Sequence, residues 1–305
     1  MGEKLAVTPM GLDAHTGAIR AAYTIKDALV ICHGASGCTF NLRNFLGIHD
    51  NSHLRVPTTG MVENNIIFGG EELLEEALEK AINVYNPELI LIQGSVIPFL
   101  IGEDTEGIAR QVGQRRGVKI VCATSPNYKG TQLDGYHNVA QHYITGLMGP
   151  ASQRIQKSVN LLGVFPGEYN WRNDQAELVR LLEDLGLAVN CVLVGDDTRV
   201  QELIKAPQAE ANVLFYPEVG LPAAQLMEER FGIPYIATDF PPIGIESCRK
   251  WLLKIAEFFG LENEGENLFD REMKELGKRL SRLSQGSFNG LEWFWSYAKE
   301  RLIKH

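Results

Sequence analysis

Short runs of β-branched and aliphatic residues alternate along this chain with amphipathic segments of helical length. Such alternation is typical of β-α units that build a parallel sheet. In the first half it predicts strands at residues 28–32, 88–93 and 118–123 and helices at residues 71–85 and 104–114. The segment 71–85 is the clearest helix, because apolar residues recur there at helical spacing with acids between them, and Asn86-Pro87 ends it. These apolar residues are Leu73, Leu74, Ala77, Leu78, Ala81 and Ile82.

The second half repeats the pattern. It predicts strands at residues 158–164, 187–194, 211–216 and 234–237, and helices at residues 174–185, 198–205 and 221–231. After residue 245 the pattern contains only helices, which we predict at residues 246–260, 270–283 and 291–302. Gly149-Pro150 is a plausible boundary between the two halves.

The predicted fold class is therefore α/β, with two doubly wound, Rossmann-like parallel-sheet subdomains followed by a helical C-terminal tail. We expect the first subdomain at residues 1–150, the second at 151–245 and the tail at 246–305. A length of 305 residues agrees with this division, because one hydrophobic core seldom organises so long a chain.

Charge narrows the possible partners. The 29 Lys and Arg residues against 38 Asp and Glu residues give a net charge of −9, whereas a nucleic-acid-binding surface needs concentrated positive charge. No apolar run approaches the roughly 20 residues that cross a bilayer, and residues 1–10 lack the apolar stretch of a signal peptide. We therefore expect a cytoplasmic protein that binds neither nucleic acid nor membrane.

The five cysteines are too few and too scattered for a disulfide scaffold, which fits a reducing compartment. Cys122, Cys191 and Cys248 lie in apolar segments where a small side chain is enough, so we interpret them as core residues. Cys32 and Cys38 are different, because they bracket the unusual stretch Cys32-His33-Gly34-Ala35-Ser36-Gly37-Cys38 directly after a predicted strand. Gly34 and Gly37 would allow tight turns there, where open α/β sheets place their sites.

Two thiols on one turn suggest iron–sulfur ligation, although one chain offers only two of the four thiolates that a cluster takes. A dimer interface could supply the others. The competing interpretation is that Cys32 ends a buried strand and only the glycines matter, since Cys-x5-Cys is not a recognised ligand spacing.

Other polar segments suggest helix caps. Gly69-Gly70 opens the helix at residues 71–85, where an anion could bind in principle, but the following acids favour a cap and turn. The carboxylates of Glu103, Asp104 and Glu106 precede a helix and favour capping over metal binding. The sequence contains no motif for a nicotinamide cofactor, no P-loop and no zincin motif, and the histidines form no metal pattern.

The order of these segments resembles that of one family. In the first half the segments are Gly17-Ala18, Ile25-Lys26-Asp27-Ala28, His33-Gly34-Ala35-Ser36-Gly37-Cys38, Ile67-Phe68-Gly69-Gly70-Glu71, Leu100-Ile101-Gly102-Glu103-Asp104 and Asn127-Tyr128-Lys129-Gly130. In the second half they are residues 159–163, 178–186, 227–234 and 243–247. Together they resemble the nitrogenase component 1 family, over about residues 5–251. That family includes molybdenum–iron protein subunits, their cofactor-assembly scaffolds and related tetrapyrrole reductases.

The resemblance implies repeated doubly wound subdomains and a dimer or tetramer. It also implies an iron–sulfur cluster at the subunit interface that accepts electrons from an ATP-dependent iron–sulfur reductase and passes them to a bound substrate or metallocofactor. Of the three cluster-ligand positions, the middle one matches Cys38, while the others fall at or beside Leu12 and Val96, which carry no thiol. Family members also continue into a third subdomain, whereas the strand pattern here covers two.

Two hypotheses follow. In the first, this chain is a nitrogenase-like oxidoreductase subunit that forms a homodimer, or a heterodimer with another component 1-like subunit. Cys32 and Cys38 of two copies would then hold one [4Fe-4S] cluster on the twofold axis. In the second, Cys32 is buried and the chain is a scaffold or carrier for a metallocofactor or tetrapyrrole, without its own cluster. A third, plainer possibility is an unrelated two-lobed sugar- or metal-binding protein that shares only the architecture.

Overall fold

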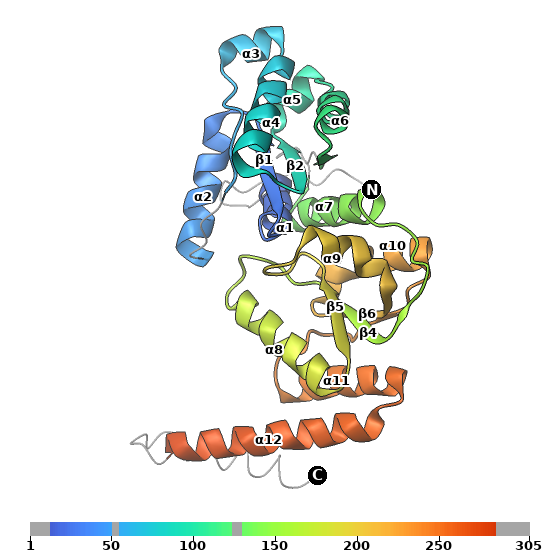
Figure 1. Ribbon diagram of the computed structural model, residues 1–305. Helices are drawn as coiled ribbons and strands as arrows, with labels where there is room; N and C mark the ends of the chain where they lie inside the picture. Colours follow the sequence, from blue (N-terminus) through green and yellow to red (C-terminus); the bar gives the residue numbers. More distant parts are fainter. Residues whose placement is uncertain (1–12, 51–54, 124–129, 285–305) are drawn as a thin grey trace. The chain divides into compact units, whose positions relative to one another are not determined.

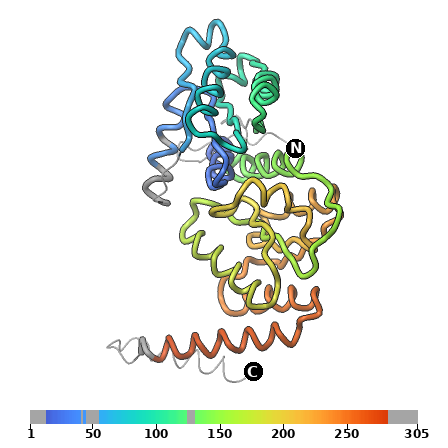
Figure 2. The backbone as a smooth tube through the Cα atoms, viewed as in Figure 1, coloured from blue at the N-terminus to red at the C-terminus, as the bar shows by residue number. Residues whose placement is uncertain are grey.

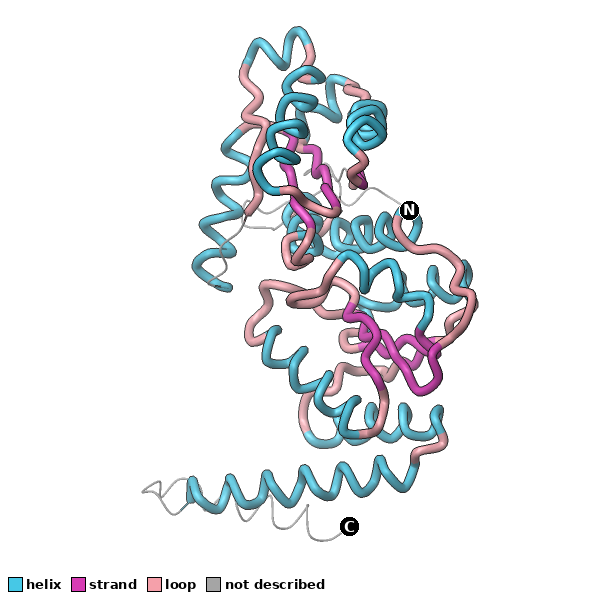
Figure 3. Tube along the Cα trace, in the orientation of Figure 1, coloured by secondary structure: helices cyan, strands magenta, loops and turns pink. Residues whose placement is uncertain are grey.

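The computed structural model describes residues 13–50, 55–123 and 130–284 (Figure 1). The chain forms two compact units, Met1–Trp251 and Leu252–His305. Two separate parallel sheets lie in the first unit, which confirms the predicted α/β class with parallel sheets (Figure 3).

The first sheet has the order β1-β2-β3 and all of its strands are parallel. Its strands are β1 (Ala28–His33), β2 (Leu89–Gly94) and β3 (Lys119–Cys122), each within two residues of its predicted bounds. The register pairs Ala28 with Leu89 and Leu89 with Lys119. β1 and β2 are almost entirely buried, as expected for parallel strands covered on both faces.

Helices cover both faces of this sheet. α4 (Glu71–Tyr85) and α6 (Thr105–Arg116) pack on the face that carries Leu29, Ile31 and Ile92. α1 (Ala14–Ala22) and α7 (Gln132–Gly146) pack on the opposite face, with Val30, Cys32 and Leu91. α4 has the predicted bounds, and the side chain of Asp104 caps α6 by accepting the Gly107 N–H at 2.9 Å, in agreement with the capping interpretation.

Two glycines bring α1 and α7 into very close contact. A Cβ atom on Gly17 would lie 1.9 Å from the Gln132 carbonyl oxygen, and one on Gly135 would lie 1.8 Å from the Ala14 carbonyl oxygen. Neither position has room for a side chain, so both glycines are needed for backbone contact rather than for an unusual φ angle. All nine residues of α1 are buried, so its polar residues lie in the core together with its apolar ones.

The second sheet has the order β5-β4-β6-β7 and is also parallel. Its strands are β4 (Ile155–Leu162), β5 (Ala188–Val192), β6 (Ala209–Leu214) and β7 (Tyr235–Ile236). Its helices are α8 (Trp171–Asp184), α9 (Val200–Lys205), the 3₁₀ turn η1 (Ala206–Gln208) and α10 (Pro217–Phe231). β4 and β5 each end two residues before the predicted bound, because Gly163 (φ +90°) and Val194 (φ +63°) turn the chain while still buried.

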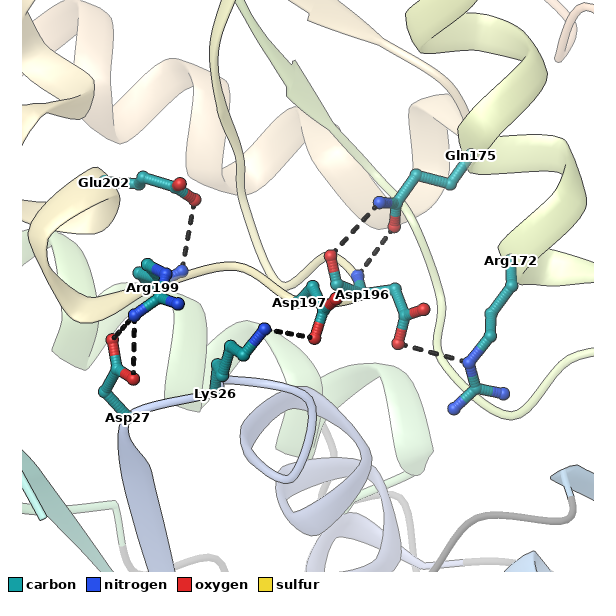
Figure 4. A network of polar contacts seen from close by, with 8 residues as sticks. All are labelled: Lys26, Asp27, Arg172, Gln175, Asp196, Asp197, Arg199 and Glu202. Carbon is teal, nitrogen blue, oxygen red and sulfur yellow. Dashed lines mark hydrogen bonds and ion pairs between the residues drawn. The ribbon is translucent and has the colours of Figure 1, made fainter.

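Apolar and polar contacts join the two sheets within the first unit. One buried core includes residues from both, such as Val30 and Leu214. At its edge the Lys26 N–H donates to the Thr198 carbonyl at 2.8 Å, and the Lys26 ammonium lies 3.4 Å from Asp197 (Figure 4). Arg199 lies 3.3 Å from Asp27 in the same network.

The C-terminal part is helical, as predicted. α11 (Ile245–Phe259) and α12 (Glu262–Ser284) follow the second sheet along the chain (Figure 2). The third predicted helix, at residues 291–302, lies outside the described residues. Among the helices that the structure describes, none is long and apolar enough to span a membrane.

Candidate functional site

The carboxyl edge of the first sheet brings together the residues that the sequence singled out. β1 ends at His33, and α2 (Ser36–Asp50) begins three residues later, so Cys38 lies in its first turn. Residues 57–61 run beside the end of β1: the Cys32 N–H donates to the Pro57 carbonyl at 2.9 Å, and the Thr59 N–H donates to the Cys32 carbonyl at 3.0 Å. α3 (Glu63–Phe68) and α5 (Val96–Ile101) complete this edge.

Cys38 is the more accessible of the two thiols. Its side chain is half-buried, and its N–H donates to the Ala35 carbonyl at 3.1 Å. Burial raises the pKa of the Cys38 thiol, while the neighbouring Ser95 hydroxyl acts in the opposite direction. Cys38 therefore lies at the surface of the first unit, although its thiol is mostly protonated near neutral pH.

Cys32 points into the core. Its side chain is 0 % exposed, and its sulfur lies 3.7 Å from His15 Nε2 on α1. Burial raises the pKa of the Cys32 thiol to about 12, so this thiol is protonated and packed like an apolar residue. The sequence pattern did not predict this contact, because His15 lies 17 residues before Cys32 and periodicity carries no information about such pairs.

The other two ligand positions implied by the resemblance offer no sulfur. Val96 begins α5 with an apolar side chain, and Leu12 lies outside the described residues. Polar neighbours of both positions nevertheless come close to Cys38: Ser95 is beside its thiol, and the charge of Asp13 raises the Cys38 pKa.

These residues fit an iron–sulfur cluster only in part. The described chain supplies one half-buried and one fully buried thiol here, whereas a [4Fe-4S] cluster takes four thiolates. No group of three or more His, Cys, Asp or Glu side chains among the described residues is arranged to hold a metal ion. His15 Nδ1 is buried and has no hydrogen-bond partner in the described part of the chain. A cluster at Cys38 would therefore need ligands from a second subunit.

On the other face of β1, His33 forms a buried pair with Glu103. Its Nε2 atom lies 2.6 Å from Glu103 Oε2, and the two side chains are 0 % and 3 % exposed. Burial lowers the pKa of His33, against the opposing effect of Glu103. The other carboxylate oxygen of Glu103 accepts the N–H of Gly70, at the start of α4. The anion at this helix N-terminus is thus a carboxylate of the chain itself.

The glycines of the predicted loop have different uses from those expected. Neither Gly34 nor Gly37 has a positive φ angle. A Cβ atom on Gly34 would lie 2.1 Å from Ser95 Oγ, so this position needs glycine for space. A Cβ atom on Gly37 would meet nothing within 4 Å. Only Gly34 is therefore required by packing.

Next to the His33–Glu103 pair lies a cluster of exposed apolar side chains, which we call the α3–α5 surface. Its members are Val62, Ile66, Ile67, Phe68, Phe99, Leu100 and Ile101, and Phe68 is 84 % exposed. A hollow of about 730 Å³ opens here, with Glu103 in its lining. The exposed Glu71 and Glu72 also line it, and the exposed Glu63 begins α3. An apolar patch of this kind indicates a contact surface for another molecule.

Comparison with known proteins identifies the family. The model of the nitrogenase component 1 type oxidoreductases matches residues 14–294. The chain belongs to this family. The component 1 fold is also present in two solved structures of nitrogenase Cp1, at pH 5 and at pH 6.5. For both, the TM-score is 0.78 and the sequence identity 25 %, over 95 % of this chain.

Relatives within the component 1 family have two different names. The nitrogenase iron–molybdenum cofactor biosynthesis protein NifE of Clostridium pasteurianum is 29 % identical over 79 % of this chain and 52 % of its own length. The nitrogenase molybdenum–iron protein alpha chain of Methanosarcina barkeri is 31 % identical over 77 % of this chain and 45 % of its own length. The matched part of this chain thus spans about half the length of either relative.

Proposed function

We propose that this chain is a subunit of a nitrogenase-like oxidoreductase. It takes low-potential electrons at an interface iron–sulfur cluster and passes them to a bound substrate or metallocofactor. The position of Cys38 carries the proposal: this half-buried thiol follows β1 at the carboxyl edge of the first sheet, at the position where the family pattern has a cluster ligand. Such a cluster would supply a one-electron carrier, and binding would deprotonate the Cys38 thiol.

A second subunit would complete the site, as either another copy of this chain or a different component 1-like chain. The burial of Cys32 favours Cys38 as the ligand nearer the interface. Ligation by both thiols of two copies stays a prediction, and it requires the Cys32 side chain to leave the core. We expect the assembly in the cytoplasm.

We assign the α3–α5 surface to the ATP-dependent iron–sulfur reductase. Exposed carboxylates accompany the apolar side chains of this surface: Glu71 and Glu72 line the same hollow, and Glu63 begins α3. Pairing of this surface with itself would bring like charges together, whereas a partner with basic residues around an apolar contact would be complementary. Its position at the same sheet edge as Cys38 suits electron delivery.

The test is iron and acid-labile sulfide analysis of the full chain purified without oxygen. We expect both elements in the wild type, their loss in Cys38→Ser, and their retention in Cys248→Ser, which removes another half-buried thiol. Cys32→Ser decides between the two ligand sets: loss of iron supports ligation by both thiols, and retention supports Cys38 alone. Iron that persists in Cys38→Ser would overturn the proposal.

The second candidate function is a scaffold or carrier for a metallocofactor or tetrapyrrole, without a cluster of its own. The burial of Cys32 favours it because, of the two thiols that bracket the loop after β1, only Cys38 is half-buried rather than fully buried. So does the similarity to a relative named for iron–molybdenum cofactor biosynthesis. A colourless, iron-free protein whose partner subunit is present would support this function and exclude the first.

A further inference from the structure

Glu103 connects three parts of the first unit. Its N–H donates to the Pro98 carbonyl at 3.1 Å and so ends α5. One oxygen of its carboxylate accepts the N–H of Gly70, between α3 and α4, and the other contacts His33 at the end of β1. Because a single buried carboxylate makes both contacts, α5 and the turn after α3 are fixed to the sheet edge together.

His33 extends these contacts toward the thiol loop. Its Nδ1 atom lies 3.0 Å from Thr59 Oγ1, which also accepts the Gly34 N–H at 3.0 Å. Every group is satisfied when the neutral imidazole donates from Nε2 to Glu103 and accepts the Thr59 hydroxyl proton at Nδ1. The hydrogen bonds thus run without interruption from Gly70 to Gly34.

Gly34 in turn is linked to Cys38 through the backbone. It packs so closely on Ser95 that a Cβ atom would lie 2.1 Å from the Ser95 hydroxyl, and the carbonyl of the next residue, Ala35, accepts the Cys38 N–H at 3.1 Å. A shift of residue 34 would therefore move Ser95 or the Ala35 carbonyl that holds Cys38. Close packing transmits such shifts, because the interior has little free volume.

We propose that the His33–Glu103 pair has a positioning role: it fixes the position of the Cys38 loop relative to the α3–α5 surface. This positioning role rests on the proposed function only because that function makes Cys38 a cluster ligand and gives the α3–α5 surface a partner. A partner that moves α3 or α5 would then alter the surroundings of Cys38 through this pair.

The test measures how fast Cys38 reacts with iodoacetamide, peptide by peptide, in the full chain after chelation of iron. Glu103→Leu removes both contacts of the carboxylate. Glu103→Gln removes the same charge but keeps an acceptor for Gly70 and, with the other imidazole tautomer, a hydrogen bond to His33. The buried thiol of Cys191 reports general unfolding in the same sample.

We expect Glu103→Leu to speed alkylation of Cys38 about fivefold or more, the factor that corresponds to one lost hydrogen bond. Alkylation of Cys191 should stay unchanged, and Glu103→Gln should behave like the wild type. Leu161→Ala, a cavity in the second sheet, controls for destabilisation elsewhere and should leave Cys38 unchanged.

Equal acceleration at Cys38 and Cys191, or none at Cys38, would overturn the proposal. If Glu103→Leu does not fold, Thr59→Val gives the same test, because it removes only the hydroxyl between His33 and Gly34 and should also expose Cys38 selectively. The readout needs no cluster, so a failed positioning role and a failed ligand role are separate outcomes.

Discussion

The sulfur of Cys32 lies 3.7 Å from the imidazole Nε2 of His15, inside the core of the first unit. Cys38, six residues later, is half-buried at the surface. Two thiols that look equivalent in the sequence thus have different environments, and their chemistry should differ accordingly.

Alkylation should separate the two thiols. In the native metal-free chain we expect iodoacetamide to modify Cys38 and to leave Cys32 and Cys191 unmodified, because Cys38 is half-buried whereas the other two are fully buried. The thiolate is the reacting form, and burial raises the Cys38 pKa, so the rate should still be rising above pH 9. Mass spectrometry of labelled peptides measures this, and modification of Cys32 before Cys38 would contradict the structure.

Alkaline pH should destabilise the fold. The pKa of Cys32 is raised from 9.0 to about 12, so the folded state holds this proton more tightly than the unfolded state does. Stability is then fully present below pH 9 and falls as the pH rises toward 12, by about 1.4 kcal/mol per pH unit for each such thiol.

In Cys32→Ala the free energy of unfolding should fall less steeply with rising pH, by the contribution of one thiol. Urea unfolding between pH 8 and about pH 11 measures this slope. Cys122→Ala is the matched control, because the pKa of Cys122 is also raised to about 12 and its removal should have the same effect. An unchanged slope in both variants would show that these thiols are not buried.

The contact between α1 and α7 should be disrupted by a side chain introduced at either of its two glycines. We expect Gly135→Ala to destabilise the first unit by about 3 kcal/mol or more, since the new methyl group would overlap the Ala14 carbonyl. Gly146→Ala, in the same helix, should change stability by less than about 1 kcal/mol, because its Cβ would lie an ordinary 3.8 Å from Val121. Equal urea midpoints for the two variants would contradict the close contact between α1 and α7.

Buried and exposed charges should contribute very differently to stability. Arg20 is 2 % exposed, donates from Nε to the Pro166 carbonyl at 2.5 Å and lies 2.9 Å from Glu168. Arg20→Ala should cost about 1–3 kcal/mol, because it leaves the buried Pro166 carbonyl without this donor, whereas the Glu168 side chain is 52 % exposed and regains water. Lys26→Ala, which removes the exposed ion pair with Asp197, should cost less than about 1 kcal/mol and less still in high salt.

The sequence predicted those elements whose apolar residues have a clear period. α4 has the predicted bounds, and the strands were found within a few residues. α1 was missed because it is buried on every side, and α2 because its first turn looks like a glycine-rich loop. α7 could have been found from Tyr136, Val139 and Tyr143, which repeat at helical spacing.

The site was predictable only where it is local in the chain. The Cys38 loop follows β1, so its place at the carboxyl edge follows from the strand pattern. The contact of His33 with Glu103 joins residues 70 positions apart, and periodicity says nothing about such pairs. Glu103 was interpreted as a cap, whereas Asp104 caps α6 and Glu103 turns inward.

Electron paramagnetic resonance of the anaerobically purified, dithionite-reduced chain with its partner subunit tests the central claim most directly. Our account predicts the signal of a reduced iron–sulfur cluster, absent in Cys38→Ser and present in Cys248→Ser. A cluster signal that survives in Cys38→Ser, or its absence from the wild-type assembly, would contradict a cluster held by Cys38.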